Sequence, residues 1–152
     1  MTEVLFYHLE RQSLDEVLPL LLSKTLQRDW RALVRCGLSE RLRALSDAIW
    51  SWREESFIPH GMAEDGHGEH QPIWLTDGDD NPNGADVLFC VEGARPGDEE
   101  LAAMDRVIIM FSGHDPQAVE QAREMWRRWK DREELELTYW RQDERGRWEK
   151  QE

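Results

Sequence analysis

Apolar residues recur along the chain in two spacings, and the two spacings alternate. Short runs rich in β-branched and aromatic residues predict strands, whereas longer stretches with apolar residues three or four positions apart predict helices. Strands are expected at residues 3–8, 30–36, 73–76, 87–91, 106–111 and 135–140, with a short last strand around residue 148. Helices are expected at residues 13–28, 39–52, 98–104 and 115–133. Because strands and helices alternate, we expect most of the strands to pair in parallel.

Polar residues at the predicted helix starts support these assignments. Ser13 begins a capping-box pattern with Glu16, and Ser39 is expected to cap the second helix. Asp115 precedes a proline, which places a capping carboxylate directly before a residue that favours the first helical position. The helices therefore have recognisable N-termini in the sequence.

The order of these elements predicts an α/β fold. We expect a three-layer α/β/α sandwich whose sheet is mainly parallel and doubly wound, with an antiparallel edge formed by the C-terminal strands. Residues 106–111 are the most continuous apolar run and should form a central strand. The 152 residues are about one domain in length, so residues 1–152 are interpreted as a single domain. With no apolar stretch near 20 residues and no basic leader, we expect a cytoplasmic protein with no membrane contact.

The motifs that mark common enzymes and nucleotide-binding proteins are missing from the sequence. The turn after the first strand, residues 9–13, has no glycine, and no GxxxxGK[ST] or GxSxG pattern occurs, so the fold should lack phosphate-binding motifs. Cys36 and Cys90 lie within apolar runs, which is typical of buried, reduced thiols. We therefore expect a non-catalytic protein without a cofactor.

A loop rich in histidine and acidic residues, at residues 60–80, is the main competing signal. Its potential metal ligands are His60, Glu64, Asp65, His67, Glu69, His70, Asp77, Asp79 and Asp80. Their spacing is irregular, and this composition is typical of a solvated loop, so we expect no metal. The alternative hypothesis is a metal-dependent hydrolase that uses this loop, and it predicts stoichiometric metal in the purified protein.

The formal net charge of -13 argues against direct binding to nucleic acid, because phosphate contacts require a basic surface. The charge is uneven, however, since residues 123–150 carry nine basic and eight acidic side chains. In the helix expected from residue 115, Arg123, Arg127 and Lys130 share one stripe, with Trp126 beside them. Such a stripe suits an acidic peptide, although a salt-bridged surface face has the same pattern. Direct nucleic-acid binding by this segment is a further alternative.

A second aromatic cluster follows the second predicted helix. Trp50 lies away from the apolar face of that helix, and Phe57 stands in a loop shortly before Pro59. We expect part of this apolar surface to be exposed, which is typical of a protein interface. A loop that folds back onto its own sheet is the alternative.

These blocks together resemble the chi subunit of bacterial DNA polymerase III, an accessory protein of the clamp-loader complex. The matching segments are FYHL (6–9), LPLL (18–21), AIW (48–50), SFIPHG (56–61), QPIWLT (71–76), NPNGA (81–85), AREMW (122–126), LTYW (137–140) and GRW (146–148). They cover nearly the whole chain in order. The resemblance implies a nucleotide-binding-like fold without nucleotide, no catalysis, and two protein partners.

The resemblance implies that one partner is the single-stranded-DNA-binding protein, whose acidic C-terminal tail would dock through its terminal phenylalanine and carboxylate. The residues assigned to this tail are Arg123, Trp126, Arg127, Lys130 and Ser112. The family has an apolar residue at the position of Ser112, so the sequence departs from the family there. The implied function is to connect the polymerase holoenzyme to single-stranded-DNA-binding protein during replication.

The second implied partner is the psi subunit, which tethers chi to the clamp loader. The residues that match the psi-contacting surface are Trp50 and Phe57, with Pro59 nearby. These residues belong to the same aromatic cluster whose exposure the helical pattern predicts.

Overall fold

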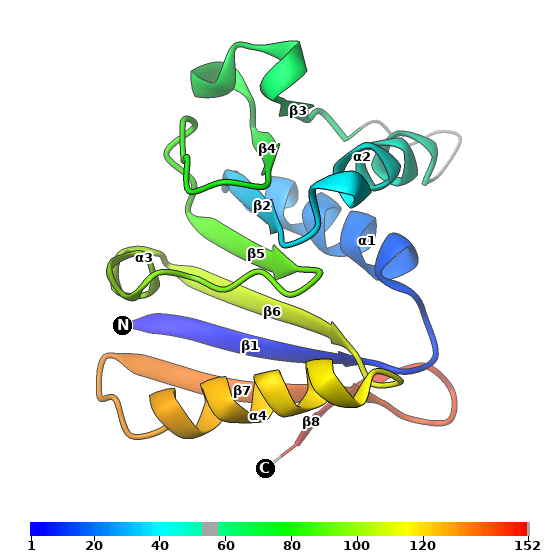
Figure 1. Ribbon diagram of the computed structural model, residues 1–152, viewed down its shortest axis with the longest axis vertical. Coiled ribbons are helices and arrows are strands. Elements are labelled where there is room, and N and C mark those ends of the chain that lie inside the picture. The colour runs from blue at the N-terminus through cyan, green and yellow to red at the C-terminus, as the bar shows by residue number, and fades with distance from the viewer. Residues whose placement is uncertain (53–57, 152) are drawn as a thin grey trace.

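The structure, a computed structural model, describes residues 1–52 and 58–151 (Figure 1). Its strands are β1 (Thr2–Leu9), β2 (Ala32–Cys36), β3 (Gly61–Met62), β4 (Ile73–Thr76), β5 (Val87–Val91), β6 (Arg106–Ser112), β7 (Leu135–Gln142) and β8 (Trp148–Gln151). They form one eight-stranded sheet in the order β3-β4-β2-β5-β6-β1-β7-β8. Every neighbouring pair is parallel except β7 and β8, which are antiparallel. The predicted parallel sheet with an antiparallel C-terminal edge is confirmed.

Helices cover both faces of this sheet. The α-helices are α1 (Leu14–Gln27), α2 (Leu42–Ser51), α3 (Asp98–Ala103) and α4 (Pro116–Trp129). One apolar core lies between the sheet and α1 and α2, and a second core lies between the opposite face and α3 and α4. The three-layer α/β/α arrangement is therefore confirmed, and β6 lies inside the sheet, as its apolar run predicts.

The sequence predicts a capping residue at three helix starts, and the structure agrees with the prediction at two of them. The Ser13 amide donates to Glu16 Oε1 at 3.1 Å, which confirms the capping box of α1. Asp115 Oδ1 accepts from the Gln117 amide at 3.0 Å and caps α4. Ser39, by contrast, does not cap α2, because it begins a separate 3₁₀ turn, Ser39–Arg41, and α2 starts only at Leu42.

One further boundary was predicted wrongly, and three short elements were missed. The helix α4 ends at Trp129, earlier than residue 133, because the chain turns through residues 130–134 to enter β7. The two-residue strand β3 and the 3₁₀ turns Ala63–Asp65 and Gly68–His70 were not expected. Elements this short contain too few residues to show an apolar period.

Both cysteines are buried, as the sequence predicts. Cys36 and Cys90 are free thiols, each 1% exposed, on opposite faces of the sheet. Burial raises the pKa of both, and that of Cys90 to about 12. Such thiols are poor nucleophiles at neutral pH. Within the described ranges, no helix has both the length and the apolar character that crossing a bilayer requires.

A partly buried ion pair joins β2, an inner strand of the sheet, to α3. The guanidinium of Arg35, on β2, donates to both carboxylate oxygens of Glu100 at 2.6 and 2.7 Å. Its Nε donates to the carbonyl oxygen of Gly78 at 2.7 Å, which holds the loop after β4. Because the Arg35 side chain is only 7% exposed, its charge depends on Glu100 for compensation.

We expect Glu100→Gln to lower the free energy of unfolding at pH 7 by about 2 kcal/mol, because it leaves the buried Arg35 unpaired. The value is smaller than for a fully buried pair, since the Glu100 side chain is 25% exposed. Urea unfolding checks this result. The matched control is Glu99→Gln, an exposed carboxylate on the same helix, which should change stability by less than about 0.5 kcal/mol.

The same pair predicts a pH dependence. Hydrogen bonds from Arg35 lower the pKa of Glu100 below its ordinary value, although partial burial opposes them. The stabilisation is therefore fully present above the pKa of the unfolded carboxyl, about 4.3, and is lost as the pH falls through the lower folded-state value. Wild type should lose more stability than Glu100→Gln on acidification from pH 6 to 3. Parallel pH profiles of the two proteins would contradict the assignment.

Candidate functional site

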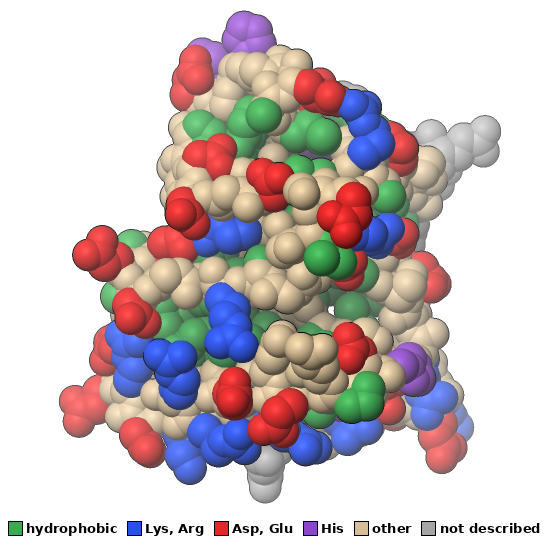
Figure 2. Space-filling view, viewed as in Figure 1, with side chains coloured by type: hydrophobic (Ala, Val, Ile, Leu, Met, Phe, Trp, Pro, Cys, Tyr) green, Lys and Arg blue, Asp and Glu red, His purple; other side chains and the backbone are tan. Residues whose placement is uncertain are grey.

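The helix α4 presents its basic residues to solvent because its opposite face is buried. Ala122, Met125 and Trp129 pack into the core, at spacings that match the helical repeat. Arg123 and Arg127 consequently lie exposed on the outer side. In the space-filling view, basic side chains gather along the lower part of the molecule, where Figure 1 places α4 and β8 (Figure 2).

A cluster of aromatic rings fixes α4 to the sheet. Phe6, on β1, is fully buried, and its ring centroid lies 5.4 Å from that of Trp126 and 6.3 Å from that of Tyr139. The rings of Trp126 and Tyr139 meet edge to face at 6.0 Å. Trp129 completes the cluster at 6.1 Å from Phe6. Trp126 and Tyr139 are thus held in place by the core, while each remains partly exposed.

These half-exposed rings border a cavity of about 420 Å³, which we call the arginine pocket. Its lining residues are Arg123, Trp126, Arg127, Tyr139, Arg141 and Gln151. They come from α4, β7 and β8, and none of the described residues that line the pocket carries a carboxylate. Three guanidinium groups beside two aromatic rings can bind an anion that is attached to an apolar group.

The three arginines of the pocket differ in their partners. Arg127 Nη2 lies 3.0 Å from Glu120 Oε1, but both side chains are more than half exposed, so this pair is weak. Within the described ranges, Arg123 makes no ion pair. Arg141 contacts Glu10, on the loop after β1. The pocket therefore contains one arginine without an internal carboxylate and one that is only weakly paired.

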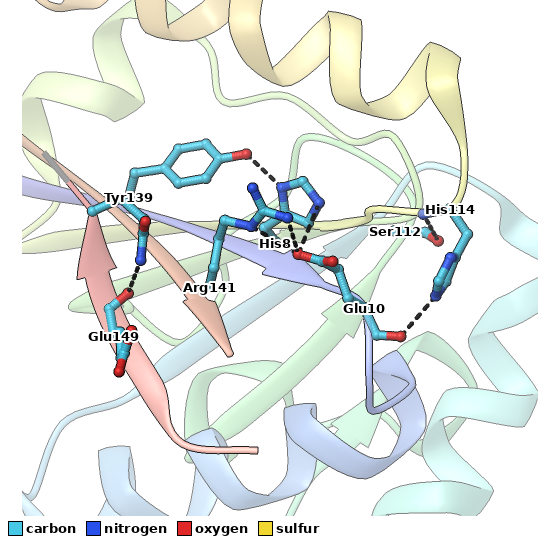
Figure 3. A network of polar contacts seen from close by, with 8 residues as sticks. His8, Glu10, Ser112, His114, Tyr139, Arg141 and Glu149 are labelled. Atoms are coloured by element: carbon cyan, nitrogen blue, oxygen red, sulfur yellow. Dashed lines mark hydrogen bonds and ion pairs between the residues drawn. The ribbon is translucent and has the colours of Figure 1, made fainter. Parts of the chain in front are cut away.

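Tyr139 and Arg141 of the pocket also belong to a polar network (Figure 3). Tyr139 Oη and His8 Nδ1 are 2.6 Å apart, and His8 Nε2 lies 3.5 Å from Glu10 Oε1. Arg141 Nε donates to the same oxygen of Glu10 at 2.7 Å. Burial lowers the pKa of His8, and the charge of Arg141 lowers it further. Desolvation opposes ionisation of Glu10, yet the hydrogen bond and charge of Arg141 hold its pKa below its ordinary value.

Gly113 allows the loop between β6 and α4 to approach this network. A Cβ atom at this position would lie 2.3 Å from His8 Nε2 and 2.8 Å from Glu10 Cγ. The Gly113 amide donates to the carbonyl oxygen of Leu9 at 2.7 Å, which fixes the loop against the end of β1. A residue with a side chain would have to displace His8 or Glu10.

A second, larger cavity of about 880 Å³ lies where the loops after β1, β5 and β6 meet, and we call it the carboxyl-end cavity. Doubly wound sheets bind nucleotides at this position. Here the carboxylates of Glu16 and Asp115 already accept hydrogen bonds from the backbone near the starts of α1 and α4, where a phosphate would bind. The geometry is consistent with the expected lack of a phosphate-binding motif.

The structure brings together some of the residues predicted for the tail and separates others. Arg123, Trp126 and Arg127 line one pocket. Lys130 is exposed at the end of α4 and is not among the pocket residues. Ser112 lines the carboxyl-end cavity instead, because β6 ends there.

Sequence reasoning missed Tyr139, Arg141 and the network residues behind them. Residues 135, 137, 139 and 141 alternate along β7, so the period-two pattern places Tyr139 and Arg141 on one face. That face meets α4 because β7 pairs in parallel with β1, with Tyr139 beside Phe6. The missing information was therefore the position of β7 in the sheet.

The potential ligands of the loop at residues 60–80 do not converge, because no three or more histidine, cysteine or acidic side chains in the described part of the chain are grouped so that they could hold one metal ion. His60 is buried, and its two ring nitrogens contact Ser46 Oγ and the carbonyl oxygen of Ile58, each at 2.9 Å. Burial lowers its pKa. It therefore has a structural role that connects α2 to the chain before β3.

Trp50, the member of the predicted aromatic cluster that lies on α2, is exposed, as the helical pattern predicts. Trp50 is 46% exposed, and its ring centroid lies 4.1 Å from that of His60. Pro59 is partly exposed beside it in sequence. Phe57, the other residue predicted for this surface, lies outside the described residues. Trp50 thus rests on a buried histidine and presents its outer side to solvent.

Comparison with known proteins identifies the family. A family model described as "DNA polymerase III chi subunit, HolC" matches residues 1–136. A relative from Rickettsia prowazekii (strain Madrid E), named "Probable DNA polymerase III subunit chi", is 26% identical over 91 residues. That match covers 60% of this chain and 55% of the relative, so it spans about half of the relative's length. The chain belongs to the family of DNA polymerase III chi subunits.

Proposed function

We propose that this chain connects the DNA polymerase III complex to single-stranded-DNA-binding protein by holding the acidic C-terminal tail of that protein in the arginine pocket. The observation that carries the proposal is the convergence of Arg123, Arg127 and Arg141 around a cavity bordered by Trp126 and Tyr139. Family membership supports the polymerase side of the connection. The pocket chemistry supports an anionic partner with an aromatic terminus.

Each part of such a tail has a suitable group in the pocket. The guanidinium of Arg123, which has no internal carboxylate in the described ranges, can take the terminal carboxylate through two parallel hydrogen bonds. The terminal phenylalanine can pack against the exposed sides of Trp126 and Tyr139, whose rings meet each other edge to face. Preceding acidic residues would be attracted by the remaining cations of α4.

The charge of the remaining surface suits an adaptor that does not compete for DNA. The chain carries a net charge of -13, which repels the phosphate backbone and leaves the basic groups around α4 as the attractive region. We propose accordingly that the protein is non-catalytic, acts in the cytoplasm, and binds DNA only through its partner. Several weak contacts of this kind strengthen attachment when they act together.

We expect Arg123→Ala to weaken binding of a tail peptide that ends in acidic residues, proline and phenylalanine by about 1 to 3 kcal/mol. The reason is loss of the paired hydrogen bonds to the terminal carboxylate. Arg127→Ala should act in the same direction. Fluorescence anisotropy with a labelled peptide measures both affinities, which should also fall with added salt because part of the attraction is between screened charges.

The matched control is Arg128→Ala, which removes the same charge from an exposed position on the same helix, outside the pocket lining. It should weaken binding by less than about 0.5 kcal/mol. Equal losses for Arg123→Ala and Arg128→Ala would mean that only overall charge matters, and the pocket assignment would have to be withdrawn.

We further propose that the exposed surface at Trp50 binds the psi subunit of the clamp loader. A half-exposed tryptophan that is supported from below by His60 offers a large, rigid apolar contact. Pro59 lies next to His60 in the chain and is partly exposed. This surface belongs to α2, whereas the arginine pocket is built from α4, β7 and β8. The two partners would therefore use separate elements.

Trp50→Ala is expected to lower the amount of psi subunit that co-purifies with the chain at least about tenfold, since a buried aromatic anchor typically contributes 2 kcal/mol or more. Leu38→Ala is the control, because Leu38 is also an exposed apolar residue, at 44%, but lies after β2. Affinity for the tail peptide should be unchanged in both variants. Undiminished co-purification of psi with Trp50→Ala would reject this surface.

A further inference from the structure

Arg141 differs from the other pocket arginines in the way that it is held. Its Nε and Nη2 atoms lie 2.7 and 2.6 Å from the same oxygen, Oε1 of Glu10. Arg141 lines the arginine pocket, whereas Glu10 lines the carboxyl-end cavity. The ion pair therefore joins a residue of one cavity to a residue of the other, and Figure 3 shows the two side chains in contact.

Among the described residues, Arg141 is the cation that acts most strongly on Glu10, and the charge of Arg11 has a weaker effect. The other close side-chain contact of Glu10 is His8 Nε2 at 3.5 Å. His8 is buried, and burial together with the charge of Arg141 lowers its pKa, which favours the neutral imidazole at pH 7. Arg141 is consequently the principal counter-charge of Glu10, and Glu10 occupies one edge of the Arg141 guanidinium.

The pair is accessible enough to be exchanged. The side chains of Arg141 and Glu10 are 47% and 31% exposed. An ion pair at such a surface contributes little stability, so another carboxylate of similar geometry can replace Glu10 at small cost. The terminal carboxylate or an acidic side chain of a peptide in the pocket would be such a group.

We propose that Arg141 is a third anion-binding residue of the arginine pocket and that Glu10 competes with the bound peptide for its guanidinium. This inference rests on the proposed function of the pocket and adds a selectivity device to it. Tyr139 and Arg141 lie beyond residues 1–136, which are the residues that the family model matches. The device joins Arg141 of β7 to Glu10 of the loop after β1, which lies within the matched residues.

The two roles that Glu10 could have, competing for Arg141 or positioning it, predict opposite changes in peptide affinity when the charge of Glu10 is removed. If Glu10 only positioned Arg141, removing its charge would loosen the guanidinium and weaken binding. If Glu10 competes, removing its charge releases the guanidinium and strengthens binding. The sign of the change therefore separates the two roles, and damage to the fold cannot produce a gain in affinity.

The experiment is a double-mutant cycle on the full chain, with a labelled peptide ending in acidic residues, proline and phenylalanine, measured by fluorescence anisotropy. Glu10→Gln, which keeps the size of the side chain, should tighten binding about three- to tenfold, and Arg141→Gln should weaken it by a similar factor. In the Arg141→Gln background, Glu10→Gln should tighten peptide binding no more than the control variant does.

The control is Glu124→Gln, which removes one negative charge from α4 at a residue that does not pair with a pocket arginine. It should tighten binding less than about twofold. The proposed competition would be contradicted if Glu10→Gln left the peptide affinity unchanged or weaker. It would also be contradicted if Glu10→Gln tightened peptide binding equally with and without Arg141. Absence of peptide binding by wild type would instead overturn the proposed function itself, and this inference with it.

Discussion

The packing of α4 on Phe6 is the interaction on which the candidate site depends. Phe6 is fully buried at the centre of the sheet, and the rings of Trp126, Trp129 and Tyr139 pack around it. This cluster sets the rotation of α4, because two of its tryptophans must face the sheet. Arg123 and Arg127 are then forced outward next to the exposed edge of Trp126. The core of the protein and the wall of the pocket are the same group of rings.

Charge is distributed so that the two cavities have opposite character. The arginine pocket has three guanidinium groups and, among the lining residues that the structure describes, no carboxylate. The carboxyl-end cavity, where related architectures bind nucleotides, is lined by acidic side chains that include Glu10, Glu16 and Asp115. A fold that commonly uses its carboxyl-end crevice for anions has, in this chain, its proposed anion-binding site on α4 and the C-terminal strands. The Glu10–Arg141 pair marks the boundary between the two regions.

The sequence predicted those features that depend on local pattern and missed those that depend on distant pairing. Apolar residues that repeat every two or about every 3.6 positions predicted the strand cores and the three-layer order. The helical repeat also predicted the stripe of Arg123 and Arg127. Tyr139 and Arg141 could not be assigned to the pocket, because their place depends on the pairing of β7 with β1, more than 130 residues apart in the chain. Ser112 was placed by resemblance alone, and the structure puts it in the other cavity. A two-residue strand such as β3 has no period to detect.

The central claim is that the pocket recognises a free peptide carboxylate beside an aromatic side chain. The most direct measurement compares two peptides of identical sequence, each ending in acidic residues, proline and phenylalanine, one with a free C-terminus and one amidated. The account predicts that the amidated peptide binds at least about tenfold more weakly, because a neutral amide cannot form the charge-assisted bonds to Arg123. Equal affinity of the two peptides would contradict it.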